Sequence, residues 1–284
     1  TLVPEGVPFY EVVGSDLVQR LDHWAQICLD EAVDVVIEHR VPYSRHWPSF
    51  ALMAQACGAA TIGWIHTFAA RPFYELSDLN TFMARNTPTL AELVVLSPLD
   101  VAFWKLRGVE RTIYLPNPPS PMLLEHGVVE GPRTAPQGLI GLSWVGRLDE
   151  HTKQVRSLFD VAEELKALGV DFHIEVIGPE WKGLTITEFN GEAGRRGIGE
   201  LIEAVGSRTG QNLVDALDRA HVFIGTSVIE GYQLTLVEAQ ARGLPVFMFD
   251  LPWLLTVQDN AGVISVPQGD AKVLAHRIAQ VLED

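Results

Sequence analysis

The sequence predicts an α/β protein built from two doubly wound, Rossmann-like domains. Two observations carry this prediction: short apolar strands alternate with helical stretches, and a proline cluster interrupts that rhythm near the middle of the chain. The chain has 284 residues, of which 47% are apolar, so it has enough apolar material for two packed cores. We place the first domain at residues 1–116, a proline-rich hinge at 117–137 and the second domain at 138–284.

The first domain is predicted from four apolar runs, with helical stretches between the first three. Runs of this kind favour buried parallel strands whose sheet is covered by helices on both faces. The candidate strands are Val33–Ile37, Ala60–Ile65, Leu93–Leu96 and Thr112–Leu115. The hinge follows at Pro116–Pro121, because neither a helix interior nor a central strand accommodates its prolines.

The second domain repeats the same rhythm. Apolar residues recur at helical spacing between Val155 and Leu168, and Asp270 is a candidate N-cap for a last amphipathic helix. The candidate strands are Leu139–Val145, Phe172–Val176, Leu201–Val205, Val222–Ile224, Pro245–Phe249 and Val263–Val266. Sheets of this type bind ligands at the carboxyl ends of their strands, and with two domains we also expect ligands between them.

Composition excludes several classes of protein. The formal net charge is −15, so the surface repels phosphate backbones and nucleic acid is not an expected partner. Cys28 and Cys57 lie in apolar helical stretches, which favours a reducing cytoplasm over a disulfide framework. No Asp, Glu, Lys or Arg lies between Arg45 and Arg71, but Pro48, Gly58 and Gly63 favour a helix over residues 49–57 and then a strand rather than a membrane span.

One candidate site lies in the stretch Thr226–Val246. A strand ends near Ile224, Glu230 and Gly231 follow in a loop, and a helix begins near Gln233. The free N–H groups at the start of that helix suit an anion such as a diphosphate. Glu230 before the helix start and Glu238 inside the helix suit sugar hydroxyls on either side of the anion, because carboxylates accept hydrogen bonds.

A second candidate site lies in Ser143–Lys153, directly after the first strand of the second domain. Arg147 offers a planar fork of donors, and Lys153 offers a mobile point charge. Together these two cations neutralise a departing diphosphate. The chain contains no Asp-x-Asp pair and no His/Cys cluster with zinc spacing, so no metal ligands are predicted.

These stretches resemble the GT-B glycosyltransferases of family 4, a retaining group that uses nucleotide sugars. Glu230 and Glu238 match the family's Glu-(seven residues)-Glu motif, and Gly146, Arg147 and Lys153 match its Gly-Arg…Lys loop. Weaker matches are found at Gly63–Thr67, Leu96–Ser97, Leu115–Asn117, Val176–Gly178 and Val205–Arg208. The resemblance covers most of residues 33–284.

The resemblance implies a role for each matching residue. Arg147 and Lys153 hold the diphosphate of a UDP- or GDP-sugar donor. Glu238 binds the ribose hydroxyls, and Glu230 binds hydroxyls of the transferred sugar. The other implied contacts are those of Gly178 with the nucleotide, of the Arg208 turn with the base, of Gly231, Tyr232 and Gln233 with phosphate or sugar, and of His66 with the donor sugar. The catalytic residues are then Glu230, His66, Arg147 and Lys153, with His46 a weaker candidate for the same cleft.

The implied reaction is transfer of the sugar to an acceptor with retention at the anomeric carbon and without a cofactor or metal. The acceptor is a glycan, a lipid-linked molecule or a small molecule, and a lipid-linked acceptor implies peripheral membrane contact. Three departures from the family are visible: Gln154 stands where a glycine often follows the loop Lys, Tyr232-Gln233 replaces the commoner Phe and small residue, and no first strand with a glycine-rich turn precedes Val33. We therefore expect an incomplete first domain. The alternatives are a sugar-nucleotide epimerase or a phosphorylase of the same fold, and a non-catalytic nucleotide-sugar-binding module.

Overall fold

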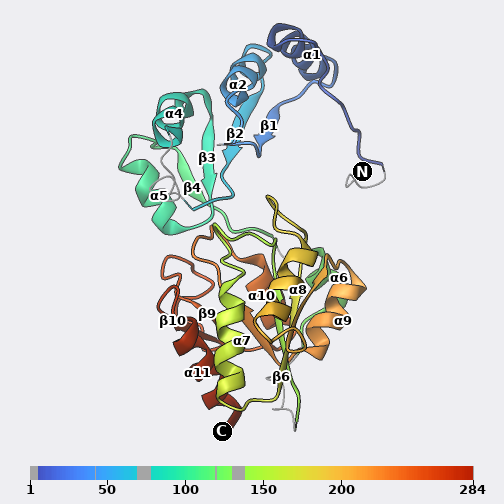
Figure 1. The fold of residues 1–284 in the computed structure, drawn as a ribbon. Helices are drawn as coiled ribbons and strands as arrows, with labels where there is room; N and C mark the ends of the chain where they lie inside the picture. The colour runs from blue at the N-terminus through green and yellow to red at the C-terminus, as the bar shows by residue number, and fades with distance from the viewer. Residues whose placement is uncertain (1–5, 42, 69–77, 119, 130–137, 284) are drawn as a thin grey trace. The chain divides into compact units, whose positions relative to one another are not determined.

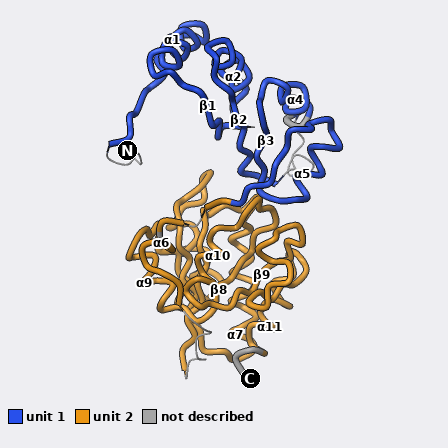
Figure 2. The backbone as a smooth tube through the Cα atoms, turned by 180° about the vertical axis from the view of Figure 1, so that it is seen from behind, with its two compact units in different colours: residues 1–116 blue, residues 117–284 orange. Residues whose placement is uncertain are grey.

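The computed structural model describes residues 6–41, 43–68, 78–118, 120–129 and 138–283. The chain divides into two compact units, unit 1 (Thr1–Pro116) and unit 2 (Asn117–Asp284), which Figure 2 colours blue and orange. Each unit contains one sheet whose described strand pairs are all parallel. The sequence prediction of parallel α/β sheets is thereby confirmed.

Unit 1 contains a four-stranded sheet with the strand order β1-β2-β3-β4 (Figure 1). Its elements are α1 (Leu17–Asp30), β1 (Val35–Glu38), α2 (Trp47–Ala56), β2 (Ala60–Trp64), α4 (Leu79–Asn86), the 3-10 turn η1 (Thr87–Thr89), β3 (Glu92–Val95), α5 (Pro98–Lys105) and β4 (Thr112–Tyr114). The charge-free stretch is a helix and then a strand, as predicted. In the described part of the chain, no helix has both the length and the apolar composition needed to cross a membrane.

Among the described residues, the crossover helices of unit 1 cover one face of its sheet. The core packs α2, α4 and α5 against a single face of the sheet. On the other face, Val35 is 52% exposed, Ile37 51% and Ile113 40%. The reason is the strand order: when successive crossovers share one hand and the strands advance in one direction, the crossover helices fall on the same face. The described part of unit 1 thus shows one half of a doubly wound pattern.

The predicted hinge contains a helix, α6 (Pro121–His126). A proline is compatible with the first turn of a helix, where its missing N–H has no helical partner to lose. Leu123 packs into the core of unit 2, and the Val129 N–H donates to the carbonyl of Ala241 at 2.8 Å. Residues 120–129 are therefore part of unit 2 rather than a free linker, while Pro119 and residues 130–137 of the predicted hinge lie outside the described residues.

Unit 2 has the strand order β10-β9-β8-β5-β6-β7, which reverses at β5 and makes the sheet doubly wound. Its strands and helices are β5 (Ile140–Val145), α7 (Ser157–Ala167), β6 (Phe172–Ile177), α8 (Ile186–Arg195), β7 (Ile202–Gly206), α9 (Gln211–Arg219), β8 (Val222–Gly225), α10 (Leu234–Ala241), β9 (Val246–Phe249), β10 (Val263–Val266) and α11 (Ala271–Glu283). One core packs α7, α8 and α11 on one face, and a second packs α6, α9 and α10 on the other. Asp270 accepts from the Val273 N–H at 3.0 Å, which confirms it as the N-cap of α11.

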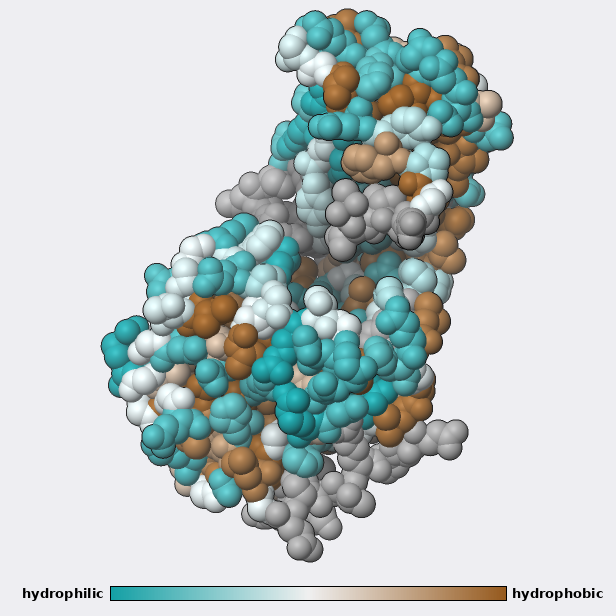
Figure 3. Space-filling model, turned by 90° about the vertical axis from the view of Figure 1, so that its right-hand side faces the viewer, coloured by the Kyte–Doolittle hydropathy of each residue, from teal (hydrophilic) through white to brown (hydrophobic). Residues whose placement is uncertain are grey.

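The surface of unit 2 is largely hydrophilic on one face (Figure 3). Hydrophilic residues dominate the face of unit 2 turned to the viewer in Figure 3, with smaller hydrophobic areas between them. In unit 1, Cys28 and Cys57 pack into one small cluster and are free thiols.

Candidate functional site

The candidate site lies where the strand order of unit 2 reverses. β5 pairs with β6 on one side and with β8 on the other, so the loops that leave the carboxyl ends of β5 and β8 start beside each other. These are residues 146–153 and residues 226–233, the two stretches that the sequence singled out. An open α/β sheet forms its ligand crevice at this switch point.

An ion pair joins the two loops. The Lys153 ammonium donates a hydrogen bond to Oε1 of Glu230. The Lys153 side chain is only 16% exposed and the Glu230 side chain 13%. The pair is therefore shielded from bulk water, and dissolved salt weakens it less than an exposed pair. The structure therefore brings together the cation expected at the diphosphate and the carboxylate expected at the sugar.

Further hydrogen bonds hold the Glu230 loop. The Val228 N–H donates to the carbonyl of Thr152 at 2.9 Å, and the Thr226 hydroxyl donates to the carbonyl of Lys153 at 2.7 Å. The Trp253 indole donates to the carbonyl of Glu230 at 3.0 Å. The Glu230 backbone is thus fixed from both the β5 side and the β9 side of the sheet, which favours a defined position for its carboxylate.

The Arg147–Lys153 loop is braced by its own carboxylates. Asp149 accepts from the His151 N–H at 3.0 Å and from the Thr152 hydroxyl at 2.5 Å. Burial acts to raise the pKa of Asp149, but these hydrogen bonds and the positive charge of Arg147 hold that pKa below its usual value. Asp149 is therefore ionised at neutral pH and keeps the loop folded.

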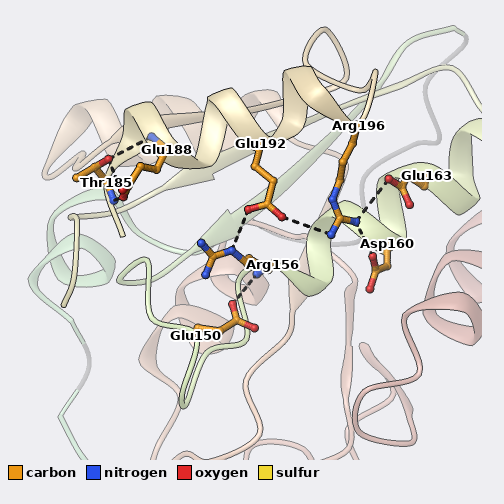
Figure 4. A network of polar contacts seen from close by, with 8 residues as sticks. All are labelled: Glu150, Arg156, Asp160, Glu163, Thr185, Glu188, Glu192 and Arg196. Atoms are coloured by element: carbon orange, nitrogen blue, oxygen red, sulfur yellow. Dashed lines mark hydrogen bonds and ion pairs between the residues drawn. The ribbon is translucent and has the colours of Figure 1, made fainter. Parts of the chain in front are cut away.

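Glu150 ties the same loop to α8, as Figure 4 shows. It accepts from the Arg156 N–H at 3.1 Å, and the Arg156 side chain pairs with Glu192 of α8 at 3.0 Å. The remaining members of this charged network are Asp160, Glu163 and Arg196, with the capping box of Thr185 and Glu188 at the start of α8. Because most of its members are exposed, the network adds little Coulomb energy to stability. Its main effect is to position the Glu150 loop against α8.

Gln154, the first departure from the family pattern, has a φ of 43°. This left-handed conformation strains a side chain and suits glycine. We expect Gln154→Gly to raise the free energy of unfolding by about 0.5–1 kcal/mol in a urea titration, since the relief of strain exceeds the entropy that glycine loses on folding. Gln154→Ala is the matched control, because alanine keeps the strain; a gain with alanine as large as with glycine would contradict this explanation.

α10 carries the second acidic residue and begins at the site. Gln233 is its N-cap and is 4% exposed, and within the described residues its Oε1 has no hydrogen-bond partner. Gly231 is buried and Tyr232 half-buried directly before it. Glu238 lies one turn into the helix, where burial raises the pKa of its carboxyl and the Ser120 hydroxyl acts against that rise.

The two other predicted residues of unit 2 follow β6 and β7. Gly178, after β6, has a φ of +152°, and a Cβ on it would lie 1.7 Å from the carbonyl oxygen of Gly146. Gly178 is therefore needed for the close approach of two loops. The Arg208 side chain pairs with Glu175 inside β6, so its side chain is held by the protein, and the expected contact of its backbone with a base stays a prediction.

His66, in unit 1, is held by a residue that the sequence did not suggest. His39 Nδ1 and His66 Nε2 are 2.7 Å apart, and both rings stack with Trp64 at centroid distances of 5.5 and 5.8 Å. Both histidines follow the carboxyl ends of their strands, β1 and β2. His46, the weaker candidate, stands exposed before α2 and makes no capping hydrogen bond there.

Partial burial of the ring lowers the pKa of His66, and the neighbouring His39 lowers it further. We expect His39→Ala to raise the pKa of His66 toward the usual value of about 6.5, because it removes the second cause and opens the ring to water. An NMR pH titration of the histidine ring signals measures this change. His46→Ala is the control and leaves the His66 titration as it is; an unchanged His66 titration in His39→Ala would contradict the assignment.

Several residues that build the site were given no role by the sequence. They are Trp144, Thr226, Trp253 and Gln268, which support the Glu230 loop, and His39, which holds His66. Their contacts depend on the order of strands in the sheets, and periodicity does not reveal that order. Among the described residues, no three His, Cys, Asp or Glu side chains form a group that could hold a metal ion.

Comparison with known proteins identifies similar sequences and folds. A sequence profile of the family described as glycosyl transferases group 1 matches residues 140–284. No curated protein matches the sequence. Among solved structures, TarM of S. aureus, in complex with fondaparinux, alpha-GlcNAc-glycerol and UDP, is 15% identical with a TM-score of 0.72, and the match covers 93% of this chain and 52% of TarM.

Two further structures are similar over more of their own length. Anabaena HepE in complex with UDP-glucose is 15% identical with a TM-score of 0.71, and the match covers 94% of this chain and 73% of HepE. A trehalose-6-phosphate synthase from a study of glycosyltransfer with retention is 15% identical with a TM-score of 0.66, over 97% of this chain and 72% of the synthase. At these identities the likeness concerns the fold, and the chain spans about half the length of TarM.

Proposed function

The chain belongs to the group 1 glycosyl transferases, and from this premise we propose that it transfers a sugar from a nucleoside diphosphate sugar to an acceptor hydroxyl with retention at the anomeric carbon. The Lys153–Glu230 ion pair at the switch point of unit 2 is the observation that carries the proposal. Lys153 suits the diphosphate of the donor and Glu230 suits its sugar hydroxyls. Their direct contact matches a donor in which the diphosphate is bonded to the sugar. UDP-sugar is the first donor to test, because TarM was solved with UDP and HepE with UDP-glucose.

In the proposed reaction, the bond between the anomeric carbon and the diphosphate oxygen breaks, and the diphosphate leaves with the electron pair. The acceptor oxygen bonds to the same face of the anomeric carbon, and its proton passes to the leaving phosphate. Arg147 and Lys153 stabilise the negative charge that develops on the diphosphate, while Glu230 holds the sugar by accepting from its hydroxyls. Glu238 orients the nucleoside by accepting from ribose hydroxyls.

In this proposal, donor binding separates the Lys153–Glu230 ion pair and gives each side chain a new partner. Lys153 exchanges Glu230 for a phosphate oxygen, and Glu230 exchanges Lys153 for sugar hydroxyls. Neither side chain is left without a partner, because the donor supplies a group of the matching kind to each. The two residues are thus held near their bound positions before the donor arrives, which reduces the entropy lost on binding.

The test combines binding with product analysis on the full chain. Calorimetric titration with UDP, GDP and ADP identifies the base, and NMR of the product from a labelled donor reports the anomeric configuration. Binding without any product from glycan, lipid-linked or small acceptors would favour the non-catalytic module. Absence of binding by all three nucleotides would overturn the proposal. We also propose a cytoplasmic location for the protein, and the two free thiols of unit 1 support it.

The raised pKa of Glu238 predicts a pH dependence of nucleotide binding. Above that pKa the carboxylate is ionised and accepts from the ribose; below it the group is protonated and this interaction weakens. We expect the affinity for UDP to fall about tenfold as the pH drops through the raised pKa, beginning above the usual value of about 4.3 for glutamate. Calorimetry between neutral and acidic pH measures the fall.

Glu238→Gln serves as the test of this assignment. It keeps the size of the side chain and does not titrate, so the variant binds UDP more weakly at neutral pH and loses the acid-dependent component. Glu200→Gln, an exposed residue at the amino end of β7, is the matched control and keeps the pH profile of the unaltered protein. A Glu238→Gln variant with an unchanged profile would assign the pH dependence to another group.

A further inference from the structure

The loops that leave β5 and β6 are joined on either side of Arg147. The Gly146 N–H donates to the carbonyl of Ile177 at 2.9 Å, and the Leu148 N–H donates to the carbonyl of Pro179 at 2.9 Å. Arg147 lies between these two hydrogen bonds, and its backbone is therefore fixed against the β6 loop. The position of its side chain then depends on what the β6 loop places beside it.

The β6 loop places Trp181 there. The Trp181 and Leu184 backbones pair with each other through hydrogen bonds of 3.3 and 3.0 Å, and Leu184 is buried, so this turn is anchored in the core. The Arg147 guanidinium carbon lies over the Trp181 ring, 4.2 Å from its centroid. A guanidinium at this distance from an indole face is held by a cation–π interaction.

The stack leaves the hydrogen-bonding edge of Arg147 available. A guanidinium that stacks through its face keeps its N–H groups in the plane, where they fit two oxygens of a phosphate. Asp149, two residues further along the same loop, accepts its hydrogen bonds from His151 and Thr152. Within the described residues, Arg147 forms no direct ion pair with a carboxylate; Asp149 feels its charge from further away.

We propose that Trp181 is a positioning residue, which holds the Arg147 guanidinium so that its in-plane donors meet the diphosphate of the donor. The inference rests on the proposed function, because it assigns Arg147 to that diphosphate. The role assigned to Trp181 is to act through Arg147 rather than on the substrate. It acts by restricting the rotamers of Arg147 before the donor arrives, which reduces the entropy that binding must overcome.

The test is calorimetric titration with UDP of four variants: Trp181→Leu, Trp181→Phe, Arg147→Ala and the double variant Arg147→Ala/Trp181→Leu. Leucine keeps apolar bulk without a π face, whereas phenylalanine keeps the face. We expect Trp181→Leu to weaken UDP binding about three- to five-fold and Trp181→Phe to restore most of that loss. Arg147→Ala should weaken binding at least about tenfold, and leucine should add no further loss in its presence.

The outcomes separate this inference from the proposed function. If the unaltered protein binds none of UDP, GDP and ADP, the proposed function fails and the role of Trp181 falls with it. If the unaltered protein binds UDP and Trp181→Leu binds it equally well, the positioning role fails alone. A loss that is the same with and without Arg147 would show that Trp181 only supports the fold of its loop.

A measurement on the protein without nucleotide tests the stack directly. The Trp181 ring current should shift the NMR signals of the Arg147 side-chain protons upfield. The shift should persist in Trp181→Phe and disappear in Trp181→Leu, while the thermal midpoint of unfolding shows whether each variant is folded. Unshifted Arg147 signals in the unaltered protein would overturn the inference regardless of any binding result.

Discussion

Replacing Glu230 by alanine is expected to lower the rate of sugar transfer about 100-fold while leaving the affinity for UDP unchanged or higher. The carboxylate that accepts from the sugar is lost, so binding of the sugar half and of its transition state weakens. UDP lacks the sugar and does not depend on that carboxylate. Lys153 loses its ion-pair partner in the variant and is free to meet a phosphate oxygen, which favours UDP.

Steady-state kinetics with a UDP-sugar and calorimetry with UDP measure the two halves of this expectation. Glu200→Ala removes an exposed carboxylate from the amino end of β7, opposite the site, and serves as the matched control that changes neither quantity. Equal losses for UDP and for the UDP-sugar would show that Glu230 supports the fold of the loop rather than the sugar. An unchanged transfer rate would remove Glu230 from the reaction.

The strands of unit 2 were predictable because β8 and β9 are apolar runs, while β6 and β7 alternate buried apolar residues with more exposed polar ones. β10 has the predicted bounds Val263–Val266, and β8 extends the predicted Val222–Ile224 by one glycine. β8 and β9 are buried at every position, as expected for strands covered on both faces, and their unbroken apolar character is visible in the sequence alone. The helix α6 was not predictable in this way, because a proline at its first position resembles a proline in a linker.

The contacts of the site were less predictable than its residues. Lys153 and Glu230 are 77 residues apart, and they meet because β8 lies beside β5. His39 and His66 are 27 residues apart and meet because β1 lies beside β2. Sequence periodicity gives the strands but not their neighbours, and for the same reason it did not show that α2, α4 and α5 share one face of the sheet.

Gln154 shows where a departure from a family pattern had structural meaning. The sequence has glutamine where the resembling family often has glycine, and the structure places this residue in the left-handed region at a φ of 43°. The departure did not reveal the conformation by itself, because a glycine serves close approach as well as a positive φ. Only the backbone geometry separates the two uses.

Gly178→Ala is expected to lower the free energy of unfolding by about 3 kcal/mol or more, because at this glycine both uses coincide. Its φ of +152° is unfavourable for alanine, and the new Cβ would lie 1.7 Å from the carbonyl oxygen of Gly146. The clash is with backbone, so no side-chain rotation relieves it. The loops after β5 and β6 must separate, and the hydrogen bonds that flank Arg147 break with them.

Gly169→Ala provides the matched control for this variant. Gly169 has a φ of +76°, and a Cβ added to it meets nothing within 4 Å, so the variant is strained without a clash. We expect it to lose about 1 kcal/mol in the same urea titration and to bind UDP normally, whereas Gly178→Ala also binds UDP more weakly. Equal losses of stability in the two variants would mean that the β5 and β6 loops separate freely. Arg147 would then not be held in place by its backbone, and its position beside Trp181 would depend on the stack alone.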